Sequence, residues 1–150
     1  MKTTPPAARF LGFAGLMPQL ACVAAAWFGP PEWRWSALAI GWAYAALILS
    51  FLGGIWWGLA AGAPDEGRRA PQWLWVAAIT PSLLALMTFL PWVFGVAWPG
   101  PSLYLLGGAI VLSILVDARL VTVRPAWWMA LRIPLSLALG AATIFLGLAA

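Results

Sequence analysis

Histidine is absent from this 150-residue chain, and cysteine and lysine occur once each, as Cys22 and Lys2. A single cysteine excludes an intrachain disulfide and a cysteine-cluster metal site. With no histidine and only four acidic residues, the usual protein ligands of zinc and haem are missing. A serine–histidine triad and a lysine-containing phosphate loop are excluded as well. We therefore predict no catalytic residues, no metal and no cofactor.

Apolar residues dominate what is present. They make up 64% of the chain, charged residues make up 8%, and the mean hydropathy is +0.94. These values are typical of an integral membrane protein rather than a soluble domain. Eight basic residues against four acidic ones would suggest a nucleic-acid partner in a soluble protein. Here the charges lie singly between apolar runs, so membrane topology explains them, and we predict no nucleic-acid partner.

The apolar runs predict an all-α, five-helix transmembrane bundle that forms a single domain over 1–150. A bilayer core requires about 20 apolar residues per helix. The sequence "VAWPGPS" divides an uncharged stretch that is too long for one span. Pro and Gly at this point predict a tight turn. The expected spans are 10–28, 35–62, 72–93, 102–120 and 127–149.

The first span has the layout of a signal peptide, because Lys2 and Arg9 precede an apolar run. Pro18 and Gln19 interrupt that run, and the residues before Cys22 make a poor lipoprotein cleavage site. We therefore expect a retained first helix rather than a cleaved signal.

The basic residues predict the orientation. With five spans, one side of the membrane receives seven of them and the other receives only Arg34, which is a strong positive-inside pattern. The seven are Lys2, Arg9, Arg68, Arg69, Arg119, Arg124 and Arg132. We expect a multi-pass protein of the bacterial cytoplasmic (inner) membrane with its N-terminus in the cytoplasm and its C-terminus outside.

Small residues recur at every fourth position of the second span. These positions are Ala46, Ser50, Gly54, Gly58 and Gly62. Residues four apart share one face of a helix, and small side chains allow close helix contact in lipid. We expect this face, the helix-packing strip, to contact a helix of the same bundle. Contact with another membrane protein or a second copy is the alternative.

Asp117 and Arg132 form a predicted ion pair within the membrane. Asp117 lies at the negative end of its helix and Arg132 at the positive end of the next, so each charge is poorly placed for its own helix dipole. A short loop joins the two helices, and Arg119 lies nearby. A structural clasp is the interpretation we favour, and a functional role for the buried charges is the alternative.

Three prolines, Pro18, Pro81 and Pro134, lie at similar depths in the odd-numbered spans. Each frees a carbonyl four residues earlier. Three kinks at one depth would widen a cavity facing the cytoplasm, although proline in membrane helices is often merely tolerated.

Four stretches together resemble a known family. They are "RFLGFAGLMPQLA", "LILSFLGGIWWGLA", "LSILVDARL" and "PAWWMALRIPLSLAL". They cover nearly the whole chain and are similar to the domain of unknown function 3429 (DUF3429) family of small membrane proteins, related to a mitochondrial transmembrane protein. The resemblance implies a short five-helix protein with no soluble domain and no established activity. In that family the position of Trp56 is commonly histidine and that of Gln19 commonly aromatic, so this chain departs at both.

These observations favour a non-enzymatic protein embedded in the lipid bilayer. We expect an accessory or assembly component that packs against another membrane protein or a second copy. The alternative is a binder or transporter of a small lipophilic ligand, with a cavity in the cytoplasmic half near Asp117, Arg119 and Arg132. The inverted repeat of many transporters is missing, which weakens transport.

Overall fold

The computed structural model describes residues 4–67 and 69–150, and that part of the chain is helical without any strand. Lys2 and Arg68, two of the basic residues used to predict the orientation, lie outside the described residues. The helices are α1 (Pro6–Ala14), α2 (Met17–Phe28), η1 (Pro31–Trp33), α3 (Arg34–Gly62), η2 (Pro64–Glu66), α4 (Trp73–Val93), α5 (Gly100–Arg119) and α6 (Trp128–Gly147).

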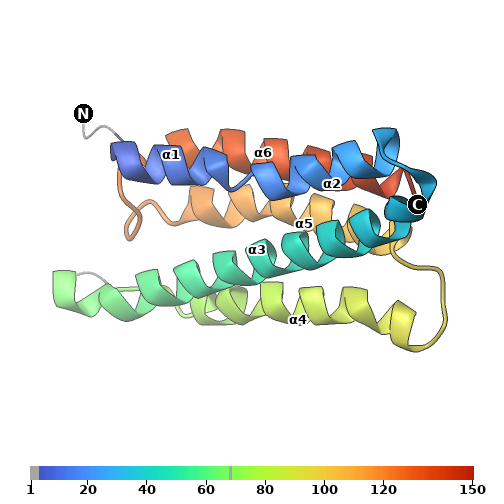
Figure 1. Cartoon of the computed structure of the whole chain (residues 1–150). Helices are drawn as coiled ribbons and strands as arrows, with labels where there is room; N and C mark the ends of the chain where they lie inside the picture. Colours follow the sequence, from blue (N-terminus) through green and yellow to red (C-terminus); the bar gives the residue numbers. More distant parts are fainter. Residues whose placement is uncertain (1–3, 68) are drawn as a thin grey trace.

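Five segments are long and apolar enough to cross a membrane, which confirms the predicted number of spans. They are Pro6–Phe28, Pro31–Gly62, Trp73–Val93, Gly100–Arg119 and Trp128–Gly147. The helix α1 begins at one end of the bundle and α6 ends at the other (Figure 1), as an odd number of spans requires.

The first span is two helices, because α1 ends at Ala14 and α2 begins at Met17. Pro18 lacks the N–H that would bond to the carbonyl of Ala14, so the helix is interrupted there. The hydroxyl of Tyr44 on α3 donates a hydrogen bond to the carbonyl of Gly15 within the interruption. A neighbouring helix therefore satisfies a backbone group that lipid would leave without a partner.

The helices pack mainly as two antiparallel pairs, α3 with α4 and α5 with α6, and α2 packs on α3 and α6. The helix α1 lies along α6, whereas α3 runs obliquely from α2 at one end of the bundle towards α4 at the other (Figure 1). As a result α1 and α3 separate along their lengths.

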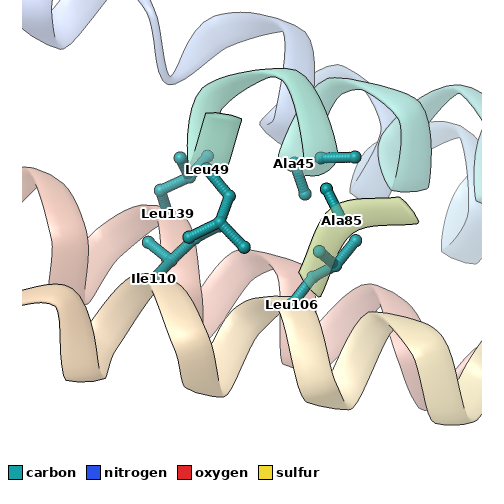
Figure 2. Packing of buried hydrophobic residues seen from close by; sticks show 7 residues of the cluster. Ala45, Leu49, Ala85, Leu106, Ile110 and Leu139 are labelled. Atoms are coloured by element: carbon teal, nitrogen blue, oxygen red, sulfur yellow. The ribbon is translucent and has the colours of Figure 1, made fainter. Parts of the chain in front are cut away.

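The centre of the bundle is a cluster of small and branched apolar side chains (Figure 2). Leu49 of α3 lies among residues from the other helices, and alanines on α3 and α4 leave room for the larger side chains between them. The labelled members are Ala45, Leu49, Ala85, Leu106, Ile110 and Leu139. This cluster joins α3, α4, α5 and α6.

Glycines bring the backbones of α5 and α6 into contact. A Cβ atom at Gly107 would lie 2.7 Å from the carbonyl oxygen of Gly140, and one at Gly140 would lie 2.8 Å from the carbonyl oxygen of Gly107. Neither position has room for a side chain without moving a helix. In lipid, van der Waals packing at such close approach is one of the forces that hold helices together.

Arg34, the one basic residue predicted on the outer side, binds the end of another helix. Its Nε donates to the carbonyl oxygen of Ala149, just beyond α6, at 2.5 Å. A cation at this position complements the partial negative charge at the C-terminal end of α6. A structural role therefore explains the one exception to the charge pattern.

Candidate functional site

Asp117 and Arg132 meet inside the bundle. Asp117 is in the last turns of α5 and Arg132 is in the second turn of α6. The Arg132 Nε lies 2.7 Å from the Asp117 Oδ2, and the two residues are 0% and 7% exposed. Arg119 is exposed at the end of α5 and takes no part in this pair within the described structure. The geometry therefore brings together two of the three charged residues selected from the sequence.

Two tryptophans complete the hydrogen bonding of the carboxylate. The Nε1 of Trp56 on α3 and the Nε1 of Trp128 on α6 donate to the Asp117 Oδ1 at 2.9 and 3.0 Å. Trp56 is 3% exposed and the neighbouring Trp57 is 49% exposed, as expected for adjacent residues that face two directions on one helix. Trp128 is the first residue of α6, and its indole N–H is nevertheless a partner of the buried charge.

Two serines bind the guanidinium group. Arg132 Nη1 donates to the Ser136 Oγ at 2.6 Å, and Nη2 donates to the Ser113 Oγ at 2.9 Å. Ser113 in turn donates to the carbonyl of Ile110 at 2.6 Å. Ser113 precedes Asp117 by four residues and Ser136 follows Arg132 by four, so the i, i+4 rule would have selected both serines from the sequence.

This buried network connects α3, α5 and α6. Its two charges cancel, and both oxygens of Asp117 accept hydrogen bonds. Such extensive pairing compensates the cost of removing the ions from water. No group of three or more potential metal ligands occurs among the described residues. The arrangement is suited to holding helices together, with three donors on the carboxylate from two other helices.

The tryptophan hydrogen bonds can be tested separately. We expect Trp56→Phe to lower the free energy of unfolding by about 1.5–3 kcal/mol, because it removes a donor to a buried charged acceptor while keeping an aromatic ring. The exposed neighbour Trp57 provides the control. Trp57→Phe should change the free energy of unfolding by less than about 0.5 kcal/mol. SDS titration in mixed micelles measures both. Equal losses at the two positions would show that ring size, and not the hydrogen bond, determines the effect.

The helix-packing strip is buried in the bundle at its first residue and faces outward at its last three. Ala46 is buried in a cluster with Ala85 of α4, and Ser50 is half-buried. A Cβ atom at the next three positions would meet no atom within 4 Å, and these positions are Gly54, Gly58 and Gly62. The expectation that the strip packs within the bundle is therefore wrong for its glycines.

Helix geometry explains the error. Four residues of an α-helix turn about 40° more than one full turn, so a strip of five such positions winds through about 160°. It begins against α4 and ends on the outer surface. The close contact is made by Gly53, where a Cβ atom would lie 2.3 Å from the carbonyl oxygen of Ala78 and 3.3 Å from the Cγ of Pro81.

The three prolines do not surround one cavity. Pro81 is buried against Gly53, whereas Pro18 and Pro134 are exposed. They lie on three different helices, α2, α4 and α6. The kinks therefore do not widen a common space.

A cleft is present elsewhere, between α1 and α3, where these two helices separate. It has a volume of about 310 Å³, and its floor is formed by α5 and α6. Its walls are almost entirely apolar, but Arg132 and Ser136 of the buried network line it. None of the three kink prolines lines it.

Comparison with protein families matches residues 4–148 to the family described as "Protein of unknown function (DUF3429)". The chain belongs to this family. The family description assigns no activity, so membership supports the membrane fold and leaves the role of the buried network open.

A relative in the frog Xenopus tropicalis is "Transmembrane protein 69". It is 33% identical over 138 residues, which cover 88% of this chain and 50% of the relative. This chain thus spans half the length of that protein, whose name states only that it crosses a membrane. No solved structure matches this chain significantly.

Proposed function

We propose that this chain is a non-enzymatic membrane protein that binds another membrane protein through the outer face of α3. The observation that supports this most directly is the bare backbone at Gly54 and Gly58, which lie one turn apart on a membrane-spanning helix with no atom near either Cβ position. Such a surface allows a second helix to approach closely, and this is how helices associate in lipid.

The residues beside these glycines favour a helix as the partner. Phe51 and Trp57 are exposed on the same helix, so large side chains flank the bare backbone at Gly54 and Gly58. A helix with its own small residues could pack closely against this surface. The partner is either another membrane protein or a second copy of this chain. In the first case this chain is an accessory or assembly component.

We further propose that the protein resides in the bacterial cytoplasmic membrane with its N-terminus in the cytoplasm. The positive-inside pattern supports this orientation. The only described basic residue at the other end, Arg34, is bound to the end of α6.

Substitution of the outer glycines tests the association. We expect Gly58→Leu to remove a stoichiometric partner or dimer that co-purifies in mild detergent, with an apparent Kd raised at least about tenfold, which corresponds to 1.4 kcal/mol. The added side chain would cover the bare backbone without affecting the fold, because nothing lies within 4 Å of this position.

Ala138→Leu is the matched control, because it places the same side chain on an exposed position of α6. It should leave the complex intact. A wild-type protein that purifies from native membranes only as a monomer would contradict the proposal, and so would a Gly58→Leu variant that keeps its partner.

The cleft between α1 and α3 favours a second candidate function, the binding or transport of a small lipophilic ligand. The observation in its support is the presence of Arg132 and Ser136 at the surface of an otherwise apolar cleft. This function does not exclude the first, since Gly54 and Gly58 do not line the cleft.

A further inference from the structure

The α1–α3 cleft has the shape of a side entrance from the lipid. The helix α1 packs on α6, and α3 is not among its close neighbours in the described structure. Leu11 and Leu16 line one wall and Ile48 and Ile55 line the other. Phe51, which is exposed on the outer surface, also lines the cleft. An apolar molecule would therefore enter sideways from the bilayer.

Hydrogen-bond donors are available at the floor of this cleft. A guanidinium group carries five N–H donors, and three of those on Arg132 have acceptors within the described structure, namely Asp117, Ser113 and Ser136. Two N–H groups are left. The Ser136 hydroxyl accepts from Arg132, and its own proton has no acceptor among the described residues. Arg132 is 7% exposed and Ser136 is 1% exposed, so bulk water does not satisfy these donors.

The charge of the network selects the kind of acceptor. Asp117 already neutralises Arg132, and a ligand carboxylate or phosphate would leave a buried net negative charge. An uncharged carbonyl oxygen accepts hydrogen bonds without that cost. The walls require the rest of the molecule to be apolar, and about 310 Å³ lies near the lower end of the range for small-molecule sites.

We propose that the α1–α3 cleft binds a lipid-soluble molecule through an uncharged carbonyl oxygen, which accepts hydrogen bonds from Arg132 and Ser136. This inference rests on the second of the two candidate functions. A quinone and the ester group of an uncharged acylglycerol both carry this chemistry.

Binding to the purified full-length protein in detergent tests the inference. The probes are a benzoquinone with a ten-carbon tail, a short-chain diacylglycerol and, as an anionic comparison, decanoate. Native mass spectrometry measures the bound fraction as each probe is titrated. We expect one-to-one binding of the quinone or the diacylglycerol, with at least tenfold weaker binding of decanoate. Whichever of the two carbonyl probes binds more tightly identifies the source of the carbonyl.

Two neighbouring alanines on α1 provide a matched pair of variants. Ala8 lines the cleft, whereas Ala7 is exposed and does not. Ala8→Trp should fill the cleft and weaken carbonyl-ligand binding at least tenfold, and Ala7→Trp should leave it unchanged. Ile55→Trp fills the same cleft from α3 and serves if Ala8→Trp does not fold.

Three results would overturn the inference: no binding of either carbonyl probe, preferred binding of decanoate, or equal loss with Ala7→Trp and Ala8→Trp. The Gly58→Leu variant separates this inference from the proposed association. Gly58→Leu should keep ligand binding and lose the partner. Ala8→Trp should keep the partner and lose ligand binding.

Discussion

Replacement of Asp117 by asparagine is expected to lower the free energy of unfolding by about 3–5 kcal/mol, because removing one member of a buried ion pair leaves the other charge uncompensated. Arg132, which is only 7% exposed, would then lie next to a neutral amide. Arg132→Gln should have a similar cost, since it leaves the carboxylate with only the two indole donors. SDS titration and the folded yield in detergent measure both changes.

The double variant Asp117→Asn with Arg132→Gln separates a clasp from a functional role. If the pair is a clasp, removing both charges should recover much of the stability lost in either single variant, because no unpaired charge remains. Single variants with normal folded yield but lost partner or ligand binding would contradict the clasp and support a functional role. A double variant no more stable than the single ones would show that the cost arises from shape and not from charge.

Gly107→Leu is expected to have the second large effect. Its Cβ atom would lie 2.7 Å from the carbonyl oxygen of Gly140 and 2.6 Å from the Cγ1 of Ile144. The backbone oxygen has no alternative rotamer, so α5 and α6 must separate. We expect a loss of at least about 3 kcal/mol, at or beyond the upper end for overpacked sites.

Gly108 is the control for this substitution. It is the next residue on the same helix, and a Cβ atom there would meet nothing within 4 Å. Gly108→Leu should therefore change the free energy of unfolding by less than about 0.5 kcal/mol, measured by the same SDS titration. Similar losses in the two variants would indicate a general intolerance of leucine in α5 and would contradict the proposed backbone contact.

The number of spans could be predicted from the sequence because it depends on the length of apolar runs and on the prolines and glycines between them. Those signals are local. The meeting of Asp117 and Arg132 was also accessible, since a short loop fixes which ends of α5 and α6 adjoin. Both inferences need only neighbouring parts of the chain.

The rest of the site depends on which face of each helix turns towards the interior of the bundle. The sequence specifies this rotation less well than it specifies the spans. Gly53 and Gly54 are adjacent and chemically identical, yet one touches α4 and the other faces outward. Trp56 and Trp128 could not be selected from the sequence as partners of Asp117. A tryptophan at the membrane interface and one whose N–H binds a buried group look the same in the sequence. The cleft arises from the divergence of α1 and α3, and no single stretch of sequence contains that information.

The paired charges also bear on how the chain enters the membrane. An aspartate or arginine near the centre of an isolated helix costs about 2.5–3.5 kcal/mol on insertion scales, and less nearer the interface. Because Asp117 and Arg132 neutralise each other only when α5 and α6 lie side by side, the two helices would insert more favourably together. We therefore expect the translocon to release this last third of the protein into lipid as a hairpin rather than one helix at a time.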